Sequence, residues 1–142
     1  MLYGGKDGIF LEVGERHKAV ERSLQCTARG EEKRARQERL QAALLAASRV
    51  PLEVAKTSRR LLEACERGIA RSSPMTASDI GVGALMAEAA LRGAALNVMI
   101  NLASVKDPAQ VKALSEDLDR ALDGAEEQRR RITDFVESRI AR

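Results

Sequence analysis

The chain has 142 residues, with 24 Lys and Arg against 21 Asp and Glu, and a net charge of +3 at pH 7. This length predicts one domain with a single core, and the acidic residues beside each basic cluster argue against a nucleic-acid partner. With no Trp, one Tyr and two Phe, the core must be aliphatic and rich in Ala, which favours an all-α protein.

The cysteine and histidine side chains predict no metal site. Cys26 and Cys65 are isolated from each other, without the spacing of a zinc site or a disulfide framework, and His17 is the only histidine. Two reduced cysteines are typical of a cytoplasmic protein. The first residues lack the basic region and apolar core of a signal peptide, so we expect a cytoplasmic location.

The first half of the chain is expected to be loop followed by helices. Residues 1–16 are interrupted by glycines and predict a loop, and residues 17–28 fit a helix. Apolar residues at helical spacing predict a helix from Glu31 to Arg49, and the same stripe continues to a stop at Gly68. Pro51 either kinks this helix or begins a second one at its first turn.

The stretch from Ser78 to Leu102 is the longest weakly charged run and predicts the buried central helix of a helical bundle. Glu88 and Arg92 are four residues apart on it, as in a helix ion pair. These charges and the abundant Ala argue against a membrane span, although the stretch is long enough for one. One side of the helix allows a backbone or a flat ligand to approach closely: Asp79, Gly83, Met86, Ala90, Gly93, Ala94, Asn97 and Asn101.

Two helix starts are visible in the second half of the chain. Thr76 and Asp79 fit a capping box, with Asp79 reaching back to the backbone of Thr76. Asp107 and Pro108 fit a second cap. Helical spacing from Pro108 almost to the end predicts one long C-terminal helix of roughly 50 Å, which would protrude or pack against a second subunit.

Three segments together resemble a known family. They are Val50–Ala55, Ser78–Leu85 and Ala89–Leu102, and in this order they closely resemble the cyclodeaminase/cyclohydrolase family of folate enzymes. The family includes formiminotetrahydrofolate cyclodeaminases and methenyltetrahydrofolate cyclohydrolases. The resemblance covers about residues 31–140, so we divide the chain into an atypical segment, 1–30, and a family-like helical domain, 31–142.

This resemblance implies an all-helical homodimer that acts on a one-carbon unit carried by tetrahydrofolate. Cyclodeaminases release ammonia while closing the methenyl bridge, and cyclohydrolases open that bridge with water. Both reactions need proton transfer and a polar pocket for a flat pterin ring. Neither needs a metal or a cofactor beyond the tetrahydrofolate that carries the substrate, and neither implies a nucleic acid or a membrane.

The N-terminal part departs from the family pattern. Members begin with a glycine-rich segment and carry a carboxylate-rich motif about twenty residues before the position of Glu31. Here Glu12 falls near that place, but the motif is not intact, and no role is carried over to Glu12. The chain therefore resembles a family member that is truncated at its N-terminus.

The candidate site residues all lie on the central helix. Asp79 is the candidate catalytic carboxylate, and the alternative is a helix cap. Asn97 and Asn101 are the candidate substrate-binding residues, and the alternative is polar contact between packed helices. Asp79 is eighteen positions before Asn97, roughly 27 Å along a straight helix, so one subunit does not bring them together around one substrate. The alternative function is a non-catalytic helical dimerisation module derived from the same fold.

Overall fold

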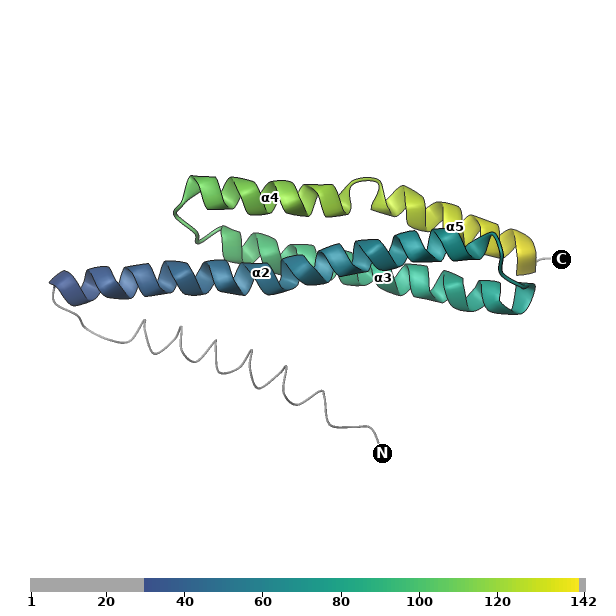
Figure 1. Ribbon diagram of the computed structural model, residues 1–142, viewed down its shortest axis with the longest axis horizontal. Helices are drawn as coiled ribbons and strands as arrows, with labels where there is room; N and C mark the ends of the chain where they lie inside the picture. Colours follow the sequence, from purple (N-terminus) through teal and green to yellow (C-terminus); the bar gives the residue numbers. More distant parts are fainter. Residues whose placement is uncertain (1–29, 141–142) are drawn as a thin grey trace, which may run out of the picture. The chain divides into compact units, whose positions relative to one another are not determined.

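The computed structural model describes residues 30–140, and within this range it contains four helices and no strand (Figure 1). The helices are α2 (Gly30–Ile69), α3 (Pro74–Leu102), α4 (Pro108–Leu122) and α5 (Ala125–Ile140). The predicted all-α fold is confirmed. The loop expected over 1–16 and the helix expected over 17–28 lie outside the described residues.

The chain divides into two compact units, Met1–Ala43 and Leu44–Arg142. In the first unit the described residues form the first turns of α2, where the Arg39 side chain donates to the carbonyl of Ala35 at 3.3 Å. The second unit holds the rest of α2 and all of α3, α4 and α5. The boundary expected at residue 30 stays a prediction.

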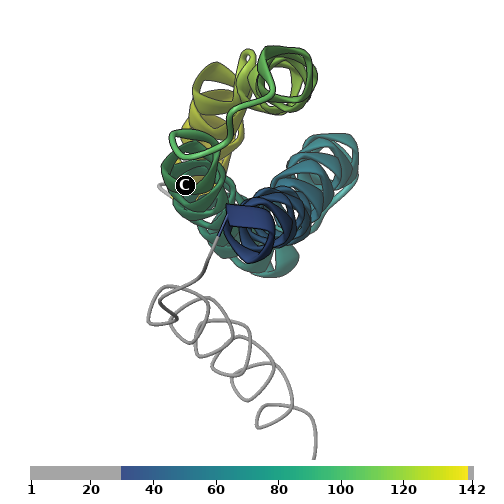
Figure 2. The same cartoon turned by 90° about the vertical axis from the view of Figure 1, so that its left-hand side faces the viewer.

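Helix α3 is the element on which the second unit is assembled. Helices α4 and α5 pack along it, nearly end to end in Figure 1 and above it in the end-on view of Figure 2. The remaining turns of α2 also contact α3, since a Cβ placed on Gly83 would lie 3.6 Å from Cys65 Sγ. The buried side of α3 is mostly Ala, which lets these helices approach closely: Ala77, Gly81, Ala84, Ala87, Leu91, Ala94, Ala95, Val98 and Leu102.

The tightest approach is between α3 and α5. A Cβ on Gly81 would lie 3.1 Å from Val136 Cγ2, closer than most real contacts, so Gly81 leaves the space that Val136 occupies. The core continues through buried Leu52, Leu62 and Ile132 from the neighbouring helices. Because Ala and Gly supply little side-chain area themselves, larger residues of α2, α4 and α5 fill the space around them.

Within residues 30–140, the central helix α3 is covered on only one side. Its opposite side is exposed and also apolar, with Met75 at 87% and Ile100 at 71% exposure. This helix is the one element among the described residues that is long and apolar enough to cross a membrane by length and composition. One third of its most apolar 18-residue window is buried, where it packs against α4 and α5.

Pro51 lies inside α2, and a side chain from α3 repairs the hydrogen bond that it removes. The helix continues unbroken to Ile69, so the alternative of a new helix beginning at Pro51 is wrong. Proline has no N–H, which leaves the carbonyl four residues earlier, at Ala47, without its helical donor. The Asn101 side chain donates to that carbonyl at 3.2 Å. Asn101 therefore joins α3 to α2 where the sequence of α2 breaks its own hydrogen-bond ladder.

The expected single C-terminal helix is two helices, α4 and α5. Gly124 separates them with φ of +63°, a left-handed conformation that Gly adopts without strain. Arg59 of α2 donates to the carbonyl of Asp123 at 2.7 Å, so a cation meets the negative end of α4 at the break. The start of α4 is as predicted, with the Asp107 side chain accepting from the backbone of Ala109 and Gln110.

Ion pairs at the rim hold α2 against the C-terminal helices. Glu66 accepts from Gln128 at 2.6 Å and from both the Nε and the terminal nitrogen of Arg131 at 3.0 and 2.8 Å. Lys56 lies 2.6 Å from Asp117. The Arg131 and Gln128 hydrogen bonds lower the pKa of Glu66, and the Lys56 hydrogen bond lowers the pKa of Asp117.

The repair at Pro51 predicts a coupled pair of mutations. Asn101→Ala should lower the free energy of unfolding by about 1–3 kcal/mol, because the part-buried carbonyl of Ala47 loses its donor. In a Pro51→Ala background the backbone N–H of residue 51 supplies that donor, so the same substitution should cost much less. Urea unfolding of the four proteins measures this coupling. Equal costs in both backgrounds would contradict the assigned role of Asn101.

The rim carboxylates predict how stability depends on pH. Their folded pKa values lie below the ordinary values of 4.5 and 3.8, so the stabilisation is present above those values and is lost as pH falls through the folded ones. Glu66→Gln should flatten the acid loss of stability, measured by urea unfolding between neutral pH and pH 3. Asp134→Asn, on an exposed carboxylate of α5, is the matched control and should leave the profile unchanged.

Candidate functional site

The candidate carboxylate, Asp79, does not cap its helix. Helix α3 begins earlier than the predicted cap, with Ser73 as the N-cap. The Ser73 side chain accepts from the backbone N–H of Thr76 at 3.2 Å, and the Thr76 hydroxyl accepts from the backbone N–H of Ser73 at 3.1 Å. The predicted cap at Thr76 is therefore wrong, because Thr76 is the third residue of a capping box that starts at Ser73.

This leaves Asp79 without a structural task among the described residues. Its side chain is exposed on the second turn of α3, and no described residue forms a hydrogen bond or an ion pair with it. A helix gains nothing from an unpaired carboxylate there beyond a weak interaction with its dipole. The local structure thus removes the alternative explanation for Asp79 and leaves it accessible to a ligand.

The two candidate asparagines differ in their surroundings. Asn97 is exposed, and its amide nitrogen donates to the carbonyl of Gly93 in the preceding turn at 3.1 Å. Asn101 is half-buried and holds the Ala47 carbonyl. Polar contact between packed helices thus describes Asn101, whereas Asn97 contacts only its own helix. Both amide oxygens remain available as hydrogen-bond acceptors.

The structure does not bring Asp79 and the asparagines together within one chain. They lie at opposite ends of the same straight helix, about 27 Å apart on the helical rise between Asp79 and Asn97. The expected strip of small and polar residues is also divided: Ala94 is buried and Gly83 faces Cys65, while Asp79, Gly93 and Asn97 are exposed.

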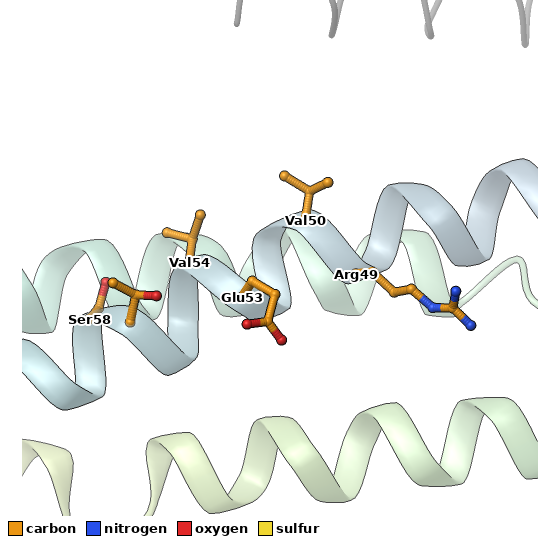
Figure 3. A pocket seen from close by; sticks show the side chains of 6 residues that line it. Arg49, Val50, Glu53, Val54 and Ser58 are labelled. Atoms are coloured by element: carbon orange, nitrogen blue, oxygen red, sulfur yellow. The ribbon is translucent and has the colours of Figure 1, made fainter.

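A hollow lies on α2, in a segment that the candidate residues do not include. It has a volume of about 510 Å³, opens to solvent and is lined by Arg49, Val50, Glu53, Val54, Thr57 and Ser58 (Figure 3). Figure 3 shows Val50 and Val54 on one side of α2, with Arg49 and Glu53 turned to another. Glu53 pairs with Lys56 at 3.3 Å. Five of the six lining residues lie outside the Val50–Ala55 motif or are apolar within it, so the sequence gave no chemical signal for this hollow.

An ion-pair network joins α3 to α5 through Glu88 and the exposed Arg92 of α3. Arg92 donates to Glu88 at 2.5 Å, as the spacing predicts, and also to Glu126 of α5 at 2.7 Å. Arg129 lies 3.5 Å from the other oxygen of Glu88. Hydrogen bonds from Glu88 and Glu126 raise the pKa of Arg92. The network occupies Arg92 with protein carboxylates, so its role is structural.

Comparison with known proteins identifies the family. The family model described as formiminotransferase-cyclodeaminase matches residues 17–120. The chain belongs to the formiminotransferase-cyclodeaminase family. It is also 34% identical over 110 residues to a protein named methenyltetrahydrofolate cyclohydrolase from Methylorubrum extorquens, a match that covers 78% of this chain and 53% of the relative. The chain thus spans about half the length of this curated relative.

The matched region of this formiminotransferase-cyclodeaminase family member contains every candidate residue. It includes the whole of α3, with Asp79, Asn97 and Asn101, and most of α4. The α2 hollow also lies within it. Helix α5, which covers Gly81 and carries the ionic contacts to Glu66 and Glu88, lies beyond the match.

The side chains of Ser73 and Asp79, both near the start of α3, should differ in their effect on the free energy of unfolding. Ser73→Ala removes the N-cap and should lower the free energy of unfolding by about 1 kcal/mol. Asp79→Asn should leave it within about 0.5 kcal/mol of the wild-type value, because an exposed side chain without a partner is exchanged. Urea unfolding midpoints decide this. A large loss in Asp79→Asn would show a structural role.

Proposed function

We propose that this chain takes part in folate one-carbon chemistry as a methenyltetrahydrofolate cyclohydrolase. The observation that carries the proposal is the 34% identity over 110 residues to a protein of that name, joined to the family match over residues 17–120. Formiminotetrahydrofolate cyclodeaminase is the related activity on the same carrier. Both activities use tetrahydrofolate as the carrier and no further cofactor or metal.

The proposed reaction assigns work to the side chains that the fold leaves accessible. Water adds to the methenyl carbon, and the ring opens when one carbon–nitrogen bond breaks, the carbon keeping the oxygen as a formyl group while the released nitrogen takes up the second proton of the water. A carboxylate positioned beside that carbon accepts the proton of the attacking water. We assign this task to Asp79, since it is exposed and has no partner among the described residues. The amides of Asn97 and Asn101 suit the polar edge of a pterin, which presents both donors and acceptors.

The charge distribution argues against a nucleic-acid partner. Basic side chains of the second unit are paired with acidic ones, as in Arg59 with Glu63 and Arg131 with Glu66. A phosphate backbone needs a row of basic side chains that gain by binding it. A cytoplasmic location agrees with this metabolic role and is part of the proposal.

Two observations favour a second candidate, a helical dimerisation module without catalysis. Asn101 has a complete structural explanation in the Ala47 contact, and the exposed apolar side of α3 suits a protein partner. This candidate predicts that substitutions on α3 alter stability or association and leave folate binding unchanged.

The test is an assay of the purified chain with both substrates. Loss of the methenyl absorbance and release of ammonia from formiminotetrahydrofolate are followed separately. We expect methenyl turnover, and we expect Asp79→Asn to lower it by about 100-fold or more, the usual contribution of a general base. Asp134→Asn removes an exposed carboxylate of α5 and should retain the activity.

A folded wild-type protein that turns over neither substrate would contradict the cyclohydrolase proposal and favour the dimerisation module. Retained activity in Asp79→Asn would show that another residue is the general base. Ammonia release without methenyl turnover would instead identify the cyclodeaminase.

A further inference from the structure

Two contacts fix how α2 and α3 lie beside each other. The Asn101 side chain donates to the carbonyl of Ala47 at 3.2 Å, and a Cβ on Gly83 would lie 3.6 Å from Cys65 Sγ. The helices run in opposite directions (Figure 1), and these two contacts are eighteen residues apart on both of them. The helices therefore keep one register, and each residue of α3 between the contacts has a residue of α2 at its level.

The α2 hollow lies beside Asn97 in this register. Its lining runs from Arg49 to Ser58, a span of nine residues or about 14 Å along the helix. Asn97 is level with the beginning of this stretch, and Ala90 is level with Ser58 at its end. A volume of about 510 Å³ is within the usual range of small-molecule sites. A ligand bound by Asn97 can therefore extend along the hollow.

Val54 and Ser58 are the lining residues on the flank of α2 beside α3. They fall between Ala47 and Cys65 at intervals of seven, four and seven residues, which places all four on one flank of the helix. Ala47 and Cys65 both lie against α3, so this flank faces the boundary between the two helices. Val54 is 45% exposed and supplies an apolar surface there.

Ser58 is a buried polar side chain without a partner among the described residues. It is 7% exposed, lines the hollow and forms no hydrogen bond with any residue from 30 to 140. The hydroxyl of Ser48, the other buried serine of α2, donates to the carbonyl of Leu44 at 2.8 Å. Burying a hydroxyl without a partner costs stability. The Ser58 hydroxyl is therefore available to a ligand in the hollow.

The side of α3 that carries Asn97 has little side-chain volume next to the hollow. Between the levels of Asn97 and Ser58 this side presents Ala90, Gly93 and Ala94. A Cβ on Gly93 would meet nothing within 4 Å, so open space lies there. Small residues let a flat ring lie close to the helix backbone. The boundary thus combines an apolar surface, open space and one unpaired hydroxyl.

The charged residues of the hollow lie away from this boundary. Figure 3 shows Arg49 and Glu53 turned to another side of α2 than Val50 and Val54. The groups that remain at the boundary are uncharged. Because an ionised group loses much of its hydration when it is covered without a partner, this surface suits an uncharged ring better than a carboxylate.

We propose that the aminobenzoyl arm of the folate substrate lies along this boundary and that Ser58 is a residue that binds it. This inference rests on the proposed function, which places the pterin at Asn97 and Asn101. The span from Asn101 to Ser58 is roughly 16 Å along the helices and gives the pterin and the benzene ring consecutive places. The ring packs against Val54 and the small residues of α3. The Ser58 hydroxyl donates to the carbonyl of the amide that follows the ring.

Binding of 4-aminobenzoyl-glutamate to the full chain tests the site without any turnover. Titration calorimetry should show binding of this compound and none of free glutamate, which carries the charges without the ring. Ala90→Leu should weaken the binding by about tenfold or more, because its side chain fills the space beside Ser58. Ala113→Leu, at an exposed position on α4, is the matched control and should bind as the wild type does.

A serine pair tests the hydroxyl itself. Ser58→Ala should weaken the binding by about three- to tenfold, the effect of one lost hydrogen bond. Ser48→Ala removes a buried hydroxyl that bonds within its own helix, so it should retain the affinity. A wild type that does not bind 4-aminobenzoyl-glutamate, or one that binds glutamate equally well, would overturn the inference. Wild-type affinity in both Ser58→Ala and Ala90→Leu would overturn it as well.

Turnover separates this inference from the proposed function. With methenyltetrahydrofolate, Ser58→Ala and Ala90→Leu should raise KM and leave kcat nearly unchanged, since they remove binding that does not change during the reaction. If the wild type binds 4-aminobenzoyl-glutamate but turns over neither folate, the proposed function fails and the binding site stands. If the wild type is active and both variants keep its KM, the proposed function stands and the binding site fails.

Discussion

The structure of the second unit depends on how closely other helices can approach α3. Ala and Gly along its buried side leave space for three neighbours, most tightly where Val136 of α5 lies against Gly81. The larger side chains of the neighbours supply the volume that α3 lacks. Rim ion pairs such as Lys56 with Asp117 fix the neighbours in place and add less to stability than this packing. A helix whose buried side chains are small can therefore lie at the centre of the core.

The same composition gives α3 a second side that the described residues do not cover. A core helix normally presents polar residues to solvent, but here the exposed side carries Met86, Leu96 and Ile100. Gly93, exposed in the middle of the helix, lowers the helix stability further. The candidate residues Asp79 and Asn97 are exposed toward the two ends of this helix.

Local signals in the sequence predicted the elements well, and contacts between distant residues were beyond them. The end of α3 at Leu102, the cap at Asp107 and the Glu88–Arg92 pair are confirmed because each depends on residues within one turn. Thr76 fits two possible capping boxes, as the third residue after Ser73 or as the N-cap itself. Residue spacing alone did not decide between them. The break between α4 and α5 depends on Gly124 alone, and the helical spacing of the apolar residues continues across it, so the spacing predicted one helix. The task of Asn101 was not predictable, because its acceptor is 54 positions away and exists only through Pro51.

The central claim is that this chain acts on the methenyl bridge of tetrahydrofolate with a carboxylate that the described residues leave exposed, Asp79. Loss of the methenyl absorbance, compared between the wild type and Asp79→Asn at equal concentrations of folded protein, tests this claim most directly. The account predicts turnover by the wild type and a rate about 100-fold lower in Asp79→Asn. A folded wild type without turnover, or an Asp79→Asn variant as fast as the wild type, would contradict the account.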